Sequence, residues 1–331
     1  MDTLRIYLFG QLRVYRDQVC LDKFPTWKAK NLFCYLLLHR QHCHARNVLA
    51  SLFWGNSPEE QARKCLRTTL WRLRSLLGPN GEPKAICLTI DNDEVCFNTD
   101  CDYWLDVEEF ENGLSASQSL SASGAGAGRV SGEALNSLTK AVELYRGDLL
   151  EGCYEDWCLY ERERLQGMFL SALAKLMASH RSQERYDEAL RCGLRILSYD
   201  PLLEEIQREV MRLHCLAGNR AAALRQYRLC QVILAKELGI EPMEETTALY
   251  RQICRGEETH GHAQYLRDDR PTNEVERRQS RSQAVHPPLA SSVDNALTEL
   301  RLAQAGFHQL DARFQRAVQT LEDVRHRLPK S

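Results

Sequence analysis

The sequence predicts a mainly α-helical fold with a small β component: an N-terminal winged helix-turn-helix, an α-helical tetratricopeptide-like repeat domain and a C-terminal heptad helix. Three observations carry this prediction. Within residues 1–100, short alternating segments are followed by three amphipathic helices and a hairpin, which is the order of a winged helix. Residues 101–254 are mainly helical with a faint internal repeat. Apolar residues over 293–328 then follow a heptad pattern.

Length and composition fit two folded domains. The chain has 331 residues, whereas a single domain takes roughly 150. Hydrophobic residues make up 44% and charged residues 27%, which is enough apolar material for hydrophobic cores. The net charge of −2 gives no overall affinity for nucleic acid, so any such site must be a local concentration of positive charge.

No stretch resembles a signal peptide or a membrane span, so we expect a cytoplasmic protein with no membrane partner. The thirteen cysteines include no CxxC pair. In a reducing compartment we interpret them as small core residues rather than as disulfides or metal ligands. His39, His42, Cys43 and His44 form a cluster, but neighbours in a short turn rarely converge on one ion. We therefore expect no metal and no cofactor.

The elements of the winged helix can be followed in order. Residues 4–22 alternate apolar and polar side chains, as in a small antiparallel sheet. Thr26 can cap the first of three helices, and the others are expected over about 46–53 and 58–77. Residues 86–97 then form two short strands joined by a turn, which is the expected wing.

The third of these helices has two chemically different faces. At the helical angle per residue, one face gathers the side chains that must be buried: Ala62, Leu66, Thr69, Leu70, Leu73, Leu76 and Leu77. The opposite face and its flanks carry the candidate DNA-binding residues: Arg63, Lys64, Arg67, Thr68, Trp71, Arg72 and Arg74. Arginine forks reach guanine edges, and lysine and threonine reach phosphates.

A cationic helix face taken alone is more often simply solvated. Here it follows a helix and a turn and precedes a hairpin, and this arrangement favours insertion into the major groove. Trp71 is unusual on such a face. We prefer the interpretation that it packs beneath the wing hairpin, and the alternative is that it contacts the sugar and backbone of DNA.

Behind the winged helix, the motif around Tyr186 recurs around Arg220, an offset of 34 residues that matches the tetratricopeptide period. A generic helical bundle remains the alternative. Residues 115–132 are rich in Ser, Gly and Ala and are predicted to be a flexible insert. Residues 255–292 are polar and charged and are predicted to be a disordered linker. The heptad helix over 293–328 forms either a coiled coil in a homodimer or a helix docked on its own repeat domain.

Two sets of motifs resemble a known family. LRIYLFGQLRVYR and SPEEQARKCLRTTLWRLRSLLG resemble the OmpR-type winged helix of the antibiotic regulatory protein (SARP) family, and YRGDLL, EDW, ERERL and LGIEP resemble its bacterial transcriptional activator domain. The resemblance covers about residues 1–254. It implies a transcription activator that binds direct repeats near a promoter and contacts RNA polymerase, with the recognition helix at 59–77. The chain departs from the pattern at Trp71, where a small residue is usual, and it has no Walker-type nucleotide-binding loop.

These observations predict a sequence-specific DNA-binding transcriptional regulator, in the form of an activator that binds promoter DNA and RNA polymerase as a homodimer. The alternative is a helical-repeat adaptor or effector-sensing protein in which the winged helix is an interaction module. Salt-dependent duplex binding separates the two. The sequence contains no HExxH, GxSxG or Walker motif, so we expect no enzymatic activity.

Overall fold

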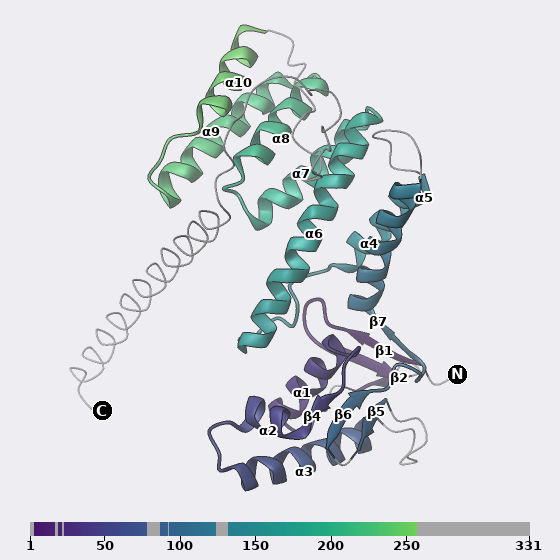
Figure 1. Cartoon of the computed structure of the whole chain (residues 1–331). Helices are drawn as coiled ribbons and strands as arrows, with labels where there is room; N and C mark the ends of the chain where they lie inside the picture. Colours follow the sequence, from purple (N-terminus) through teal and green to yellow (C-terminus); the bar gives the residue numbers. More distant parts are fainter. Residues whose placement is uncertain are drawn as a thin grey trace, which may run out of the picture. The chain divides into compact units, whose positions relative to one another are not determined.

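The computed structural model describes residues 3–16, 19–21, 23–77, 87–91, 93–123 and 132–256 (Figure 1). All its β-strands lie before the long helical part of the described chain. The predicted linker beyond residue 256 and the predicted heptad helix over 293–328 lie outside the described residues, so both stay predictions. Among the helices that are described, none has the length and apolar character that crossing a bilayer requires.

The first sheet joins the start of the chain to a strand far along the sequence. Its order is β3-β2-β1-β7. The strands are β1 (Leu4–Tyr7), β2 (Arg13–Arg16), β3 (Val19–Cys20) and β7 (Tyr103–Leu105). β1 pairs with β2 in antiparallel and with β7 in parallel orientation. β7 follows residue 100, so the predicted domain boundary falls before the strand that completes the N-terminal sheet.

Three helices follow the first strands as the sequence predicts: α1 (Trp27–Leu38), α2 (Arg46–Trp54) and α3 (Glu59–Leu77). Thr26 is the N-cap of α1, and its hydroxyl accepts a hydrogen bond from the Ala29 N–H at 3.1 Å. This bond satisfies one of the N–H groups that have no partner within the helix. Lys28 Nζ donates to the carbonyl of Phe53 at 2.7 Å, which fixes α1 against the end of α2.

A second, three-stranded sheet contains the predicted hairpin. Its order is β4-β6-β5, with β4 at His44–Ala45, β5 at Leu88–Ile90 and β6 at Glu94–Phe97. Both pairings are antiparallel. Val95 and Phe97 of β6 are buried, so one face of the hairpin packs on the core of the winged helix.

The rest of the described chain is built from helices. They are α4 (Asp106–Ser123), α5 (Gly132–Leu144), α6 (Asp156–Ser182), α7 (Tyr186–Tyr199), α8 (Glu204–Leu216), α9 (Arg220–Glu237) and α10 (Glu244–Arg255). Successive helices from α6 to α10 pack against each other. The starts of α7 and α9 differ by the 34 residues seen in the sequence, and Ala189 and Ala223 at the same place in each helix are both fully buried. The faint repeat therefore corresponds to two equivalent helices in a stack.

The predicted flexible insert is wrong in its first half, because residues 115–123 belong to α4. Ser117 is buried, and Gly113 lies so close to α5 that a Cβ at this position would be 2.9 Å from the Ala141 Cβ. Packing of one helix face against a neighbour outweighs the loop-like composition of this segment. Residues 124–131 lie outside the described part.

Three of the family motifs, YRGDLL, EDW and ERERL, lie where the helical part meets the winged helix. Phe9 forms an antiparallel bridge with Leu149 of the YRGDLL motif. Arg162 of the ERERL motif donates to the carbonyls of Leu149, Leu150 and Cys153 at 2.9 to 3.1 Å. The motifs therefore fix the junction between the two parts of the chain.

Trp157 of the EDW motif adds an aromatic contact at the same junction. Its ring centroid lies 5.5 Å from that of Tyr35 on α1, in an edge-to-face arrangement. One continuous hydrophobic core accordingly runs from β1 through α1 to α6. Two smaller clusters hold the later helices together.

Candidate nucleic-acid interface

α3 separates its two faces as the sequence predicts. Ala62, Leu66, Thr69, Leu70, Leu73 and Leu77 are buried, and Leu76 is half-buried. Six of the seven candidate residues are exposed: Arg63, Lys64, Arg67, Thr68, Trp71 and Arg72. Arg74, the seventh, is half-buried. Figure 1 shows α2 beside one end of α3 and the strands β5 and β6 near the opposite end of α3.

The charged groups on this face differ in their availability. Arg63 pairs with Glu59 one turn earlier, and the Thr68 hydroxyl donates to the carbonyl of Lys64 at 3.0 Å. Within the described residues, Lys64, Arg67 and Arg72 form no ion pair. An exposed cation without a counter-charge can bind a phosphate or a base edge without first breaking a salt bridge. These three residues are therefore the most available cations of α3.

The preferred interpretation of Trp71 is wrong. We expected this side chain to pack beneath the hairpin, but it is 68% exposed. Its position is one helical turn from Arg67 and Arg74, opposite the buried leucines, and the hairpin is packed by its own Val95 and Phe97 instead. Contact between Trp71 and DNA remains the alternative.

The wing presents acidic groups that the sequence reasoning passed over. Asp91, Asp93 and Glu94 are all exposed at the end of the hairpin, and the N–H of Asp91 donates to the carbonyl of Glu94 at 3.0 Å. The described residues of this hairpin, 87–91 and 93–97, contain no lysine or arginine. The run Asp-Asn-Asp-Glu predicts a turn, and its three acidic residues also indicate that the tip of the hairpin is negatively charged. Three carboxylates at this position disfavour close approach of the hairpin tip to phosphates.

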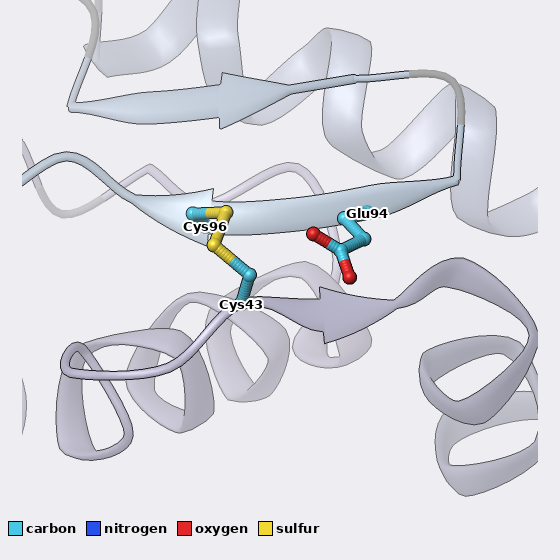
Figure 2. Close-up of side chains that lie close together, drawn as sticks. All are labelled: Cys43, Glu94 and Cys96. Carbon is cyan, nitrogen blue, oxygen red and sulfur yellow. A yellow bond between two sulfur atoms is a disulfide. The ribbon is translucent and has the colours of Figure 1, made fainter.

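The expectation that no cysteines form disulfides is also wrong. Cys43, next to β4, is bonded to Cys96 of β6 (Figure 2). The bond joins residues separated by 53 positions, and the stretch between them contains α2 and α3. Glu94 lies beside the pair, as Figure 2 shows. His39 and His44, proposed with Cys43 as a doubtful metal cluster, instead place their rings against Tyr35.

The repeat domain contacts the winged helix away from Lys64 and Arg67, which stay exposed. Arg40, just after α1, makes one of the contacts, because its guanidinium forms ion pairs with Glu108 at 3.1 Å and Glu111 at 3.0 Å on α4. Arg164 of α6 also pairs with Glu111, at 2.7 Å. The Arg40 pairs attach the end of α1 to α4, and the Arg164 pair joins α4 to α6.

Comparison with known proteins finds an activator domain and relatives that are named as regulatory proteins. Residues 105–254 match the family model of the bacterial transcriptional activator domain. The chain is 26% identical over 261 residues to the regulatory protein AfsR of Streptomyces griseus, which covers 78% of this chain and 25% of AfsR. It is 27% identical over 240 residues to the transcriptional regulatory protein MoaR1 of Mycobacterium bovis, which covers 70% of this chain and 73% of MoaR1.

A solved structure resembles the fold. EmbR of Mycobacterium tuberculosis, solved in complex with a low affinity phosphopeptide, superposes with a TM-score of 0.62 at 22% sequence identity. The match covers 78% of this chain and 66% of that chain. The predicted fold class, a winged helix followed by a helical repeat domain, is confirmed.

The chain combines a winged helix with a helical repeat domain, and the relatives that it resembles are named as regulatory proteins. Residues 105–254 match the bacterial transcriptional activator domain, as the resemblance to the SARP family predicts. The chain spans about 25% of the length of AfsR.

Proposed function

We propose that the chain is a sequence-specific DNA-binding activator that places α3 in the major groove of promoter repeats and contacts RNA polymerase. One observation carries the proposal: α3 holds its leucines in the core and points a cluster of cations away from it. A helix exposed in this way after a helix and a turn is the part that enters the groove in winged-helix proteins.

The residues have distinct roles in this proposal. Arg67 and Arg72, which form no ion pair within the described chain, are long enough for a bidentate contact with guanine. Lys64 lies one turn earlier than Arg67 and is assigned to a phosphate contact. Trp71 contacts the sugar and backbone beside them. Arg63, Thr68 and Arg74 complete the surface.

The acidic hairpin changes which element is expected to contact the DNA phosphates. Phosphate contacts supply much of the affinity of a DNA-binding protein. Because the described wing residues carry no cation, we assign most of these contacts to α3. This arrangement supports a protein that binds tightly only when several copies occupy adjacent repeats. The homodimer predicted from residues 293–328 fits such binding, as does a cytoplasmic location.

Polymerase contact rests on the family alone. AfsR and MoaR1 are named as regulators, and the chain shares the activator domain that defines the family. We assign this contact to the later helices of the repeat domain, where Leu216 of α8 and Leu229 and Val232 of α9 are exposed apolar side chains.

The test is binding to duplex DNA at several salt concentrations. Duplexes selected from a randomised library serve as the probe, with a scrambled duplex of the same length as control. Neutralising several phosphates makes the logarithm of the binding constant fall linearly with the logarithm of salt, with a slope of about −0.9 per phosphate. An adaptor that uses its winged helix for protein contacts would select no sequence and show little such slope.

A further inference from the structure

Cys43 and Cys96 face each other across the β4–β6 ladder. The register pairs His44 with Val95 and Ala45 with Glu94, and continuing it by one residue places Cys43 opposite Cys96. Their Cα atoms are 4.4 Å apart, close to the roughly 4.5 Å of directly opposed residues that exchange no backbone hydrogen bonds. The two sulfurs can therefore bond or separate without a change in strand register.

Both cysteines are at least partly accessible from solution. Cys43 is exposed and Cys96 is half-buried. Cys34, in contrast, is fully buried, and burial raises the pKa of its thiol. Accessible thiols are the ones that oxidants and reductants reach, and disulfides in reducing compartments are usually transient. The compartment expected from the sequence is a reducing one.

The disulfide also lies beside the short pairing of β4 with β6. β4 has only two residues, so it pairs with β6 through two residue pairs. The disulfide adds a covalent link between the wing strand and the segment that enters α2. The proposed recognition helix α3 lies within the loop that this link closes.

We propose that Cys43 and Cys96 are a reversible thiol–disulfide pair, and that closing it raises duplex affinity by fixing the wing sheet relative to α3. The regulatory part of this inference rests on the proposed DNA-binding function. A fixed interface loses less conformational entropy on binding than a mobile one. The oxidised form is therefore the tighter binder.

The chemistry requires a hydroperoxide as oxidant and a dithiol as reductant. The Cys43 thiolate attacks the peroxide oxygen, the O–O bond breaks, and a sulfenic acid forms with release of water or an alcohol. The Cys96 thiol then attacks this sulfur, the S–S bond forms and a second molecule of water leaves. Reduction returns two electrons and two protons by thiol–disulfide exchange.

With Glu94 beside it, the reduced cysteine pair could bind a metal ion instead of forming a disulfide. Its carboxylate and the two sulfurs lie within 4.8 Å of one another, and this is the one such group of potential metal ligands in the described part of the chain. Two thiolates and a carboxylate are a ligand set that suits zinc. A metal held here would block oxidation, so zinc ions belong in the test.

The first experiment maps thiols in the full-length protein. After hydrogen peroxide, peptide mass spectrometry with maleimide labelling should find Cys43 joined to Cys96, and dithiothreitol should restore both thiols. Cys96→Ser should leave Cys43 outside any disulfide, whereas Cys20→Ser, at another exposed cysteine, should not alter the pairing. Free thiols at both positions after peroxide, or full protection of both by zinc ions, would overturn the proposal.

The second experiment measures duplex binding of the oxidised and reduced protein. We expect the oxidised form to bind about fivefold more tightly, an effect of the size that modest preorganisation gives. The double variant Cys43→Ser and Cys96→Ser should match the reduced form under both conditions, and Cys20→Ser should respond like the unmodified protein. Equal affinity of both forms would overturn the regulation but leave the DNA-binding function intact. Absence of duplex binding in both forms would instead reject the proposed function, and the regulation with it.

Discussion

The carboxylate of Asp106 accepts a hydrogen bond from the backbone N–H of Leu8 at 2.9 Å, across 98 residues of sequence. Asp106 is the first residue of α4 and is only 2% exposed. It also accepts from the N–H groups of Phe9 at 3.0 Å and Val107 at 2.8 Å. One buried carboxylate therefore satisfies backbone groups on both sides of the junction between the winged helix and the repeat domain.

Stability should depend on pH through Asp106. Burial raises the pKa of this carboxyl from 3.8 to about 6, although the N–H donors act in the opposite direction. As pH rises from 4 to 6, the unfolded chain loses this proton while the folded chain keeps it, so the contribution of Asp106 to stability falls across that window and then levels off. Urea unfolding from pH 4 to pH 7 should show this fall relative to Asp106→Asn. Parallel pH curves for the two proteins would contradict the assignment.

Arg40 should matter far more for stability than Arg63. The Arg40 side chain is buried and binds Glu108 and Glu111, and its removal takes this partner from Glu108 and leaves Glu111 paired with Arg164 alone. Arg40→Ala should lower the free energy of unfolding by about 2 kcal/mol, below the range for a fully buried pair because the glutamates are partly exposed. Arg63→Ala breaks an exposed pair and should cost less than about 0.5 kcal/mol. Similar losses in the two variants, measured by urea unfolding, would refute this ranking.

Replacing both Lys64 and Arg67 by alanine should weaken duplex binding several-fold and leave thermal stability unchanged, because both side chains are exposed and make no ion pair in the described chain. The salt slope should become shallower by about 1 for each phosphate that the variant no longer neutralises. Lys140→Ala with Lys175→Ala removes the same charge from exposed positions of the repeat domain and is the matched control. Unchanged binding in the α3 variant would mean that another face contacts DNA.

Charge reversal at the wing should strengthen DNA binding. Asp93→Lys removes a repulsion and adds an attraction near the phosphates, so affinity should rise at low salt. The gain should shrink as salt increases, because the Debye length falls from about 30 Å at 0.01 M to about 10 Å at 0.1 M. Glu143→Lys makes the same change of charge at an exposed position of α5, outside the winged helix, and should have little effect. A titration of both variants against one duplex makes the comparison.

Deletion of residues 290–331 should lower the oligomeric state. The heptad spacing over 293–328 predicts a coiled coil between two copies. Sedimentation equilibrium of the two proteins measures the change directly. Equal oligomeric states would favour the alternative, in which the heptad helix docks within its own chain.

The parts that the sequence predicts well depend on local chemistry. Thr26 caps α1 because a hydroxyl at that position reaches an N–H three residues later, and the spacing of the leucines alone determines which side of α3 is buried. The 34-residue offset likewise predicts equivalent helices, since Ala189 and Ala223 repeat the same packing position.

The errors concern contacts between distant residues. The Cys43–Cys96 bond follows from the register of β4 with β6, and neither residue carries a local signal for its partner. The helix over 115–123 depends on the close approach of Gly113 to Ala141. Trp71 is exposed rather than packed beneath the hairpin, whose buried side chains are Val95 and Phe97.

The pairing of β1 with β7 affects how the protein is made. β1 leaves the ribosome before β7, so Leu4 must wait for Tyr103 before the parallel edge of its sheet can form. The hydrogen-bond partner of Leu8 arrives later still, at Asp106. The N-terminal region is therefore completed only when the first residues of the next domain have been translated, and a nascent chain stalled at residue 100 would expose an unpaired strand edge to its neighbours.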